Sequence, residues 1–187
     1  MVSEYLVDSD QGNLLSEPRW YALRTRARAE KKTDILLRRA GIETFAAVVE
    51  VERRWKDRTR RVEVPLFSGY IFVHIPLEDS VRVLRQPGAV ELVKSRGVPA
   101  PLREEEMDAV MRLVRGMEAT GNPPVETDYL QPGMPVLVTQ GPFQGMKGVL
   151  MEARGRSVVA VKLDAIRMAR AVQVDRRWVK RVDRAVA

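Results

Sequence analysis

The first hundred residues alternate short apolar runs with amphipathic segments. Residues 19–25, RWYALRT, alternate apolar and polar positions and predict a half-buried strand. In residues 27–41 the apolar positions recur at helical spacing, and Gly41 is placed to end this helix. Residues 43–55 are rich in β-branched side chains and predict a strand, and the runs RVEVPLF and YIFVHI predict the two strands that follow it.

Two further helices are predicted before the pattern changes. Residues 76–86 carry acidic side chains in the first turn, where the helix dipole favours them, and PGAVELV then predicts a turn and a strand. Residues 101–116 combine early glutamates, an apolar stripe that begins at Met107, and a final Gly116 that is expected to end the helix. This order of strands and helices predicts an antiparallel α+β domain over residues 19–117.

The pattern of apolar and polar residues changes after residue 117. Residues 118–128, EATGNPPVETD, are polar, contain Gly and two prolines, and predict a linker. Residues 129–187 hold five short β-like runs separated by turns such as GPFQG, which is typical of a small β-barrel. At the other end, residues 1–18 lack periodicity and predict a disordered tail.

Composition restricts the function more than the fold. There is no cysteine among the 187 residues, which excludes disulfides, thiolate catalysis and the usual structural zinc sites. The first residues are acidic and polar, unlike a signal peptide, so a cytoplasmic location and no membrane association are expected. The net charge of +7 is uneven, because residues 127–187 carry 11 Lys and Arg against 5 Asp and Glu. Such a surface suits either an acidic polymer such as nucleic acid or plain solvation.

Nothing in the sequence predicts an enzyme, a cofactor or a metal site. His74 is the single histidine and lies in a strand-like run, where a structural or surface role is expected. The run Glu104 to Glu106 points around a helix and does not converge on one site. No phosphate-binding loop is present, because the glycines of GPFQGMKG lie between two strands and open no helix.

Two clusters of residues are candidates for binding a macromolecular partner. The stretch RRWKDRTRR, residues 53–61, suits either a hairpin tip that contacts phosphates or a solubilising turn. The corner PLFSGY places Phe67 and Tyr70 at a bend, with aromatics on both sides of the strand. Core packing and an exposed protein-binding patch both explain that corner. Phe143, on the turn GPFQG, is likewise either a contact residue or a plug for one end of the barrel.

These motifs together resemble one family. RWYALRT, the amphipathic helix, PLFSGYIFV and LRQPGAVELV resemble the N-terminal (NGN) domain of NusG-type transcription elongation factors. QPGMPVLVTQGPFQGMKGVLMEARG resembles the C-terminal KOW motif of that family, and RAVQVDRRWVKRV resembles its closing strand. The resemblance covers about residues 19–182. It implies an antiparallel sheet flanked by helices, followed by an SH3-like barrel.

The resemblance also implies a mechanism and a set of contacts. The N-terminal domain is expected to bind the clamp helices of the RNA polymerase β′ subunit, bridge to the β subunit and suppress pausing. The implied clamp contacts are Phe67, Tyr70, Phe72 and Tyr21, and the implied β-side contacts are Ser80, Val81 and Arg82. The face toward upstream or non-template DNA comprises Arg24, Arg26, Lys31 and Arg85. The implied assembly is a monomer.

The C-terminal barrel of this family recruits a partner, such as termination factor Rho or a small-subunit ribosomal protein. Phe143 and Gly148 match the positions expected for that contact. The barrel is more basic than expected for the housekeeping member, which favours a specialised, operon-specific paralogue that touches RNA or DNA directly. The barrel residues expected in that contact are Arg154, Arg156, Lys162, Arg176, Arg177, Lys180 and Arg181.

Several features depart from the family or leave another class open. Ser68 replaces the proline usual in the corner, and Arg167-Met168 replaces a usual Gly-Arg pair. KOW barrels also occur in ribosomal proteins, so an RNA-binding, ribosome-associated structural protein is the alternative. The N-terminal domain with PLFSGY argues against that alternative.

Overall fold

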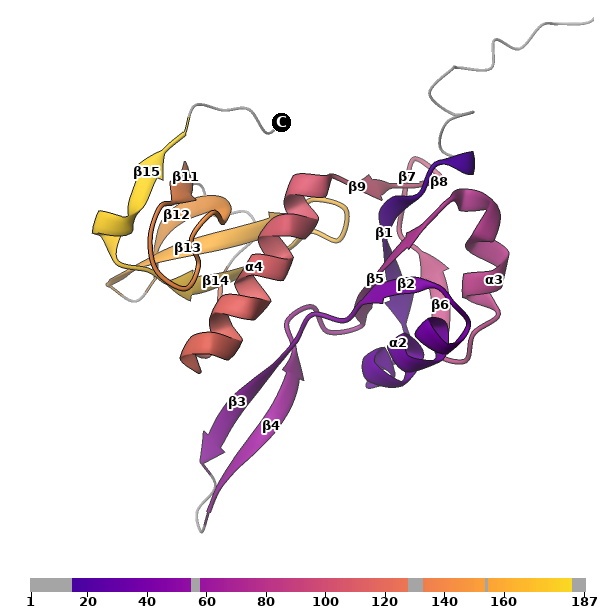
Figure 1. Cartoon of the computed structure of the whole chain (residues 1–187), viewed down its shortest axis with the longest axis horizontal. Helices are drawn as coiled ribbons and strands as arrows, with labels where there is room; N and C mark the ends of the chain where they lie inside the picture. Colours follow the sequence, from indigo (N-terminus) through magenta and orange to yellow (C-terminus); the bar gives the residue numbers. More distant parts are fainter. Residues whose placement is uncertain (1–14, 55–57, 128–132, 154, 183–187) are drawn as a thin grey trace, which may run out of the picture. The chain divides into compact units, whose positions relative to one another are not determined.

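The computed structural model describes residues 15–54, 58–127, 133–153 and 155–182 (Figure 1). Within this part of the chain the contacts group the elements into two units. Their bounds are Met1–Ala46 with Ser68–Leu102 for unit 1, and Ala47–Phe67 with Arg103–Ala187 for unit 2.

Unit 1 is built on an antiparallel sheet in which β1 is the central strand. The strand order is β2-β5-β1-β6, and β9 also pairs with β1. The strand predicted to be half-buried is buried on both faces, because Trp20 to Leu23 are consecutively buried and Arg24 is the exposed residue of β1. The strands are β1 Arg19–Thr25, β2 Glu43–Phe45, β5 Tyr70–Ile75, β6 Ala89–Leu92 and β9 Pro101–Leu102.

Two helices cover one face of this sheet. Leu37 of α2 and Val83 of α3 pack in the same core as Tyr21, Leu23 and Ile71 of the strands. Gly41 follows α2 with a φ of 74°, which confirms it as the stop for that helix. The remaining elements of unit 1 are α2 Glu30–Arg39, η1 Leu77–Asp79, α3 Ser80–Leu84, β7 Lys94–Ser95 and β8 Val98–Pro99.

Unit 2 contains a hairpin, a long helix and a small antiparallel sheet (Figure 1). The hairpin pairs β3 Val48–Arg54 with β4 Thr59–Pro65, and the helix α4 spans Glu104–Thr120. The six strands follow the order β10-β14-β13-β12-β11-β15 around a core that includes Met151 and Val158. They are β10 Val125–Glu126, β11 Met134–Val138, β12 Lys147–Ala153, β13 Arg156–Leu163, β14 Met168–Gln173 and β15 Val179–Arg181, with η2 Arg176–Trp178 before β15.

The observed elements agree with the predicted α+β class and differ from the prediction in three places. The single strand expected over residues 43–55 is two strands, because the chain leaves β2 after Phe45 and joins a different partner in β3. Helix α4 does not end at Gly116; it continues to Thr120, and the left-handed cap is Gly121, with a φ of 67°.

The segment predicted as a linker also contains parts of two elements. Its first three residues, 118–120, complete α4, and Val125–Glu126 form β10 against β14. Unit 2 thereby joins the hairpin and α4 to the C-terminal strands. Residues 1–14 of the predicted tail and residues 128–132 lie outside the described residues.

A buried hydroxyl in unit 1 leads to a stability prediction. Tyr21 is fully buried, burial raises the pKa of its phenol, and its Oη has no hydrogen-bond partner among the described residues. Tyr21→Phe removes an unsatisfied polar group without opening a cavity, so the free energy of unfolding should stay equal or rise by about 1 kcal/mol. Urea denaturation of the two proteins measures this difference.

The neighbouring residue Leu23 supplies the control for that measurement. It is also fully buried in the same core, and Leu23→Ala should lower the free energy of unfolding by about 2–5 kcal/mol. A loss of more than about 1 kcal/mol in Tyr21→Phe would mean that the hydroxyl has a partner in solution.

Candidate partner-binding surfaces

The corner PLFSGY is held by hydrogen bonds to two other elements of unit 1. Gly69 has a φ of 83°, a left-handed conformation that glycine adopts without strain. Its N–H donates to the Glu30 carboxylate at 2.7 Å, and its carbonyl accepts from the Thr25 N–H at 2.8 Å. The start of α2 and the end of β1 therefore fix where β5 begins.

Tyr70 lies at the accessible end of one face of the sheet. The register pairs Tyr70 with Arg24 and Phe72 with both Ala22 and Phe45. Phe72 is fully buried, whereas Tyr70 is half-buried. Arg24 forms an ion pair with Glu91 of β6 at 2.8 Å, so an aromatic ring and a charged pair share this end of the face.

The structure does not gather all four residues expected at the clamp-binding patch. Tyr21 points to the opposite face of the sheet from Phe72, because the two belong to register positions of opposite parity. Phe67 belongs to unit 2, is buried, and has the Arg170 guanidinium 6.0 Å from its ring centroid. Tyr70 and Phe72 remain together.

The residues expected at the β-side contact lie at the start of α3. Val81 is the most exposed of the large apolar side chains described, at 57%. Arg82 instead serves the fold, since its guanidinium donates to the Ala40 carbonyl at the end of α2 and lies 3.9 Å from the Asp79 carboxylate. Ser80 is half-buried at the first position of α3.

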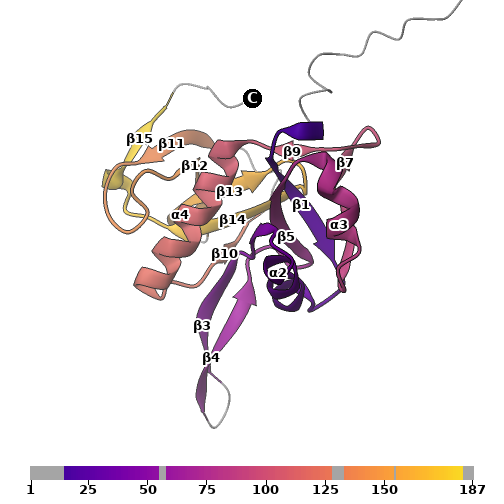
Figure 2. The same cartoon turned by 45° about the vertical axis from the view of Figure 1, so that its right-hand side comes forward.

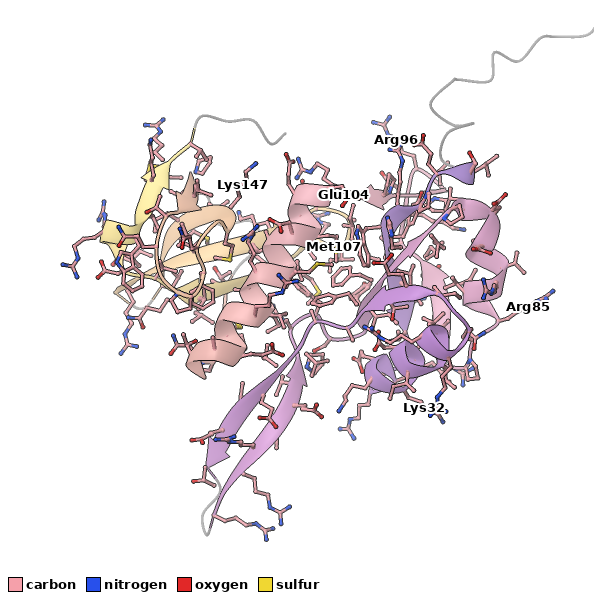
Figure 3. All side chains as sticks on the ribbon, viewed as in Figure 1. Lys32, Arg85, Arg96, Glu104, Met107 and Lys147 are labelled. Atoms are coloured by element: carbon pink, nitrogen blue, oxygen red, sulfur yellow. The ribbon has the colours of Figure 1, made fainter. Side chains whose placement is uncertain are left out.

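The basic residues expected to face DNA lie on exposed positions around α2 and the end of α3. The Arg26 N–H donates to the Gly88 carbonyl, which brings the loop after β1 next to the loop after α3. Figure 3 shows Lys32 and Arg85 with their side chains directed outward from this part of unit 1. Lys31 is also exposed, and Arg24 forms the ion pair with Glu91 described above.

In unit 2, the turn GPFQG docks against helix α4. Phe143 is only 3% exposed, and a Cβ added to Gly116 would lie 2.3 Å from its ring. Gly116 is therefore the socket for Phe143 and not the end of a helix. Gly148 has a different role, because a Cβ there would lie 2.7 Å from the Ala160 carbonyl of β13 and would force β12 and β13 apart.

Polar contacts extend this docking along one face of α4. The Arg112 guanidinium donates to the Gln144 carbonyl at 3.2 Å, and Lys147 lies 3.7 Å from the Glu105 carboxylate. The helix positions in these contacts share one stripe at helical spacing, which comprises Glu105, Ala109, Arg112 and Gly116. Sequence analysis missed this second stripe. Its signal was a glycine and an alanine inside a helix, at positions 116 and 109.

The basic residues expected to contact nucleic acid from the C-terminal strands lie in three places. Val174 donates to the Ser157 carbonyl, which brings Arg156 to the same end of the sheet as Arg176 and Arg177. Lys162 lies near the other end of β13, opposite Ala169, and Lys180 and Arg181 lie on the edge strand β15. Arg177 hydrogen-bonds the Asp175 carboxylate through its side chain and its N–H and lowers the Asp175 pKa to about 2. Arg154 lies outside the described residues.

Metal-binding clusters and membrane-spanning helices are absent from the described residues. They contain no cluster of three or more His, Asp or Glu placed to bind a metal ion. None of their helices is long and apolar enough to cross a membrane. His74 stacks on Trp20 at 4.9 Å and lies 2.8 Å from the Glu43 carboxylate, as a structural histidine does.

The fold defines a class of protein: an α+β protein with an antiparallel sheet module followed by a small β-module. The family model described as "Transcription termination factor nusG" matches residues 18–111, which is half of the chain. The chain therefore belongs to the NusG family of transcription factors. Members of that family are not enzymes, which confirms the expectation from sequence. The C-terminal strands are consistent with an SH3-like KOW domain.

Two curated relatives and one solved structure are similar to this chain. The transcription termination/antitermination protein NusG of Haemophilus influenzae is 26% identical over 80% of this chain and 87% of its own length. The protein of the same name from Escherichia coli K12 is 34% identical over 54% of this chain and 56% of its own length. A solved structure described as domain interaction in Thermotoga maritima NusG is 25% identical over 89% of this chain and 98% of its own, with a TM-score of 0.49.

The socket at Gly116 makes a prediction that opposes helix propensity. Gly→Ala inside a helix normally stabilises by about 1 kcal/mol. Here the new Cβ collides with Phe143, so Gly116→Ala should lower the free energy of unfolding or release the turn from α4. Thermal unfolding measures the first effect, and amide hydrogen exchange over residues 141–146 measures the second.

A double-mutant cycle isolates the contact. In a Phe143→Ala background, Gly116→Ala has no ring to meet, and only the Pro142 carbonyl lies close to the new Cβ, at 2.9 Å. The cost of Gly116→Ala should therefore be smaller in that background than in the wild type. Glu118→Ala, at an exposed position of the same helix, is the control for propensity alone. A stabilising Gly116→Ala in the wild-type background would show that Phe143 does not occupy the socket in solution.

Proposed function

We propose that this protein is a bacterial transcription elongation factor that binds RNA polymerase, suppresses pausing and promotes antitermination in the cytoplasm. The observation that carries this proposal is the family match over residues 18–111, which includes the sheet that bears Tyr70 and Phe72. The relatives named above are termination/antitermination proteins. The same match favours transcription over the alternative of a ribosome-associated protein.

In the proposed complex, the face of the sheet that bears Tyr70 binds the clamp helices of the β′ subunit. Tyr70 is accessible, and Phe72, two residues further along the same face of β5, is fully buried. The accessible ring therefore lies next to the packed core of the sheet. Phe67 joins this contact only if its burial in unit 2 is relieved. Tyr21 supports the sheet from its opposite face.

The remaining contacts divide between the β subunit and DNA. Val81, exposed at the start of α3, is the side chain we assign to the β-side contact, with Ser80 and Arg82 beside it. The basic positions Arg24, Arg26, Lys31 and Arg85 face upstream or non-template DNA. Clamp binding of this kind favours the closed, processive state of the polymerase by mass action.

The KOW domain recruits its partner after it leaves α4. Phe143, which we assign to that contact, is buried against Gly116 and therefore inaccessible while the turn is docked. Nascent RNA, Rho or a small-subunit ribosomal protein are the candidate partners. The basic character of this domain supports a specialised, operon-specific paralogue that acts as a monomer.

Tyr70 provides the direct test of polymerase binding. Tyr70→Ala should weaken binding to core RNA polymerase by about tenfold, which corresponds to about 1.4 kcal/mol. The same variant should lose antipausing activity in transcription over a pause and a terminator on the native leader DNA. Val98→Ala, exposed elsewhere in unit 1, should bind and act as wild type. A folded Tyr70→Ala that binds normally would return this residue to a structural role only.

Direct contact between the KOW domain and RNA is tested by salt dependence. We expect Arg156→Gln, Arg176→Gln, Lys180→Gln and Arg181→Gln in one full-length chain to reduce the salt slope for single-stranded RNA by up to about 3. The charge-matched control changes exposed cations elsewhere: Arg39→Gln, Lys94→Gln, Arg96→Gln and Arg115→Gln. Equal slopes in both variants would mean that these barrel cations are merely solvated.

A further inference from the structure

A groove in unit 2 lies between strand β3 and the C-terminal end of helix α4. Its volume is about 730 Å³, within the range of roughly 300–1,000 Å³ that is typical of ligand pockets. Its lining includes the consecutive β3 residues Val48 to Glu52 and, from the end of α4, Met117 and Glu118. Figures 1 and 2 show β3, and not β4, on the side of α4. The groove therefore follows the outer edge of β3.

The first hydrogen bond of the hairpin sets the phase of its ladder. The Leu66 N–H donates to the Ala47 carbonyl at 2.7 Å, at the base of the hairpin. Hydrogen-bonded and non-hydrogen-bonded pairs alternate along an antiparallel ladder, so the next pair, Val48 with Pro65, is not hydrogen-bonded. Pro65 fits that position, because proline has no N–H to donate. Every second pair beyond it is then also a non-hydrogen-bonded pair.

The outer edge of β3 is open as a result. Val49 and Val51 direct their N–H and C=O groups to β4, whereas Val48, Glu50 and Glu52 direct theirs away from it. No other strand in the described part of the chain pairs with β3. An open edge of this kind accepts a further strand, and five residues of edge span about 17 Å at ~3.3 Å each. The outward groups offer up to about six backbone hydrogen bonds.

The two faces of β3 differ in chemistry beside this edge. One face carries Val49 and Val51, and Val49 is only 2% exposed. The other face carries Glu50 and Glu52. A strand that adds to β3 also places alternate side chains on opposite faces. Its side chains would therefore meet valines on one face and carboxylates on the other.

The groove is acidic although the chain as a whole carries a net charge of +7. Its described lining holds four carboxylates against the guanidinium of Arg61, which pairs with Glu52 at 3.7 Å. Glu50 and Glu118 are exposed and have no ion-pair partner among the described residues. The last turn of α4 contains no basic residue, so the negative end of its dipole adds to the acidic potential. The described carboxylates are not clustered as a metal ion requires, which favours cations spaced along a strand.

We propose that this groove binds an extended protein segment in which basic and apolar residues alternate, and that the segment adds to β3 as an antiparallel strand. In antiparallel pairing, the residue opposite Glu50 hydrogen-bonds the Glu50 backbone and shares its face. Charge complementarity makes that residue Lys or Arg. Its neighbours place apolar side chains beside Val49 and Val51. The surface uses none of the residues assigned to polymerase, DNA or RNA, so it extends the proposed function without depending on it.

The test measures binding of the full-length protein to a fluorescein-labelled peptide, KVKVKVK, blocked at both ends, by fluorescence anisotropy. A variant that combines Glu50→Gln with Glu118→Gln should bind about fivefold more weakly, because two charge pairs are lost. The matched control combines Glu78→Gln with Glu104→Gln, at exposed positions outside the groove, and should bind as wild type. Both variants change the net charge equally, and thermal unfolding shows whether each remains folded.

Backbone methylation tests strand addition separately from charge. The lysine N–H groups of the peptide face β3 in the proposed pairing, so N-methylation of the lysine amides should abolish binding. N-methylation of the valine amides should preserve it, because those groups face away from β3. In amide hydrogen exchange, the unmodified peptide should protect the Glu50 and Glu52 amides, whereas those of Val49 and Val51 are already bonded to β4.

Three results would each overturn the proposal. The first is equal affinity of the groove variant and its matched control for KVKVKVK. The second is binding that tolerates methylated lysine amides, or an acidic peptide, EVEVEVE, that binds as tightly. The third is unchanged exchange at Glu50 and Glu52 when the peptide is bound.

Discussion

The contact between Phe143 and Gly116 determines how unit 2 is built. Phe143 lies on a turn and is buried because its ring packs against the backbone of α4. Only glycine at position 116 leaves room for that ring, since any Cβ there would collide with it. The helix gives up about 1 kcal/mol of propensity at that position. In return it buries a second stripe, so that Ala109, Leu113 and Gly116 are all covered. The ion pair of Glu105 with Lys147 and the hydrogen bond from Arg112 to the Gln144 carbonyl lie along the same face of α4.

The packing of unit 2 makes two of the expected partner-binding side chains inaccessible. The two aromatics expected to bind partners from unit 2, Phe67 and Phe143, are both buried within that unit. Tyr70 and Val81 of unit 1 are accessible. In the proposed function, unit 1 therefore offers its polymerase contacts directly, whereas the KOW domain offers Phe143 only after the turn leaves α4. Such a change requires an interaction that favours the released state over the docked one.

Charge is distributed to match the proposed partners. Arginines around α2 and at one end of the KOW sheet lie on separate elements. Arginines also stabilise the fold: Arg82 hydrogen-bonds the Ala40 carbonyl, Arg112 pairs with Asp108, and Arg177 pairs with Asp175. The net charge does not distinguish arginines that contact a partner from arginines that stabilise the fold, because arginine has both roles. The positions of the partners in the structure make the distinction.

The sequence by itself determined the local elements and the family. Alternation identified β1, helical spacing with Gly41 bounded α2, and the runs after residue 129 predicted the KOW strands, because these features depend on near neighbours. Only the tertiary structure decided the rest. It placed Tyr21 and Phe72 on opposite faces through strand register, carried α4 past Gly116, and buried Phe143 in a socket that residues 27 positions away create. Register and close approach depend on residues distant in sequence, and no local pattern encodes them.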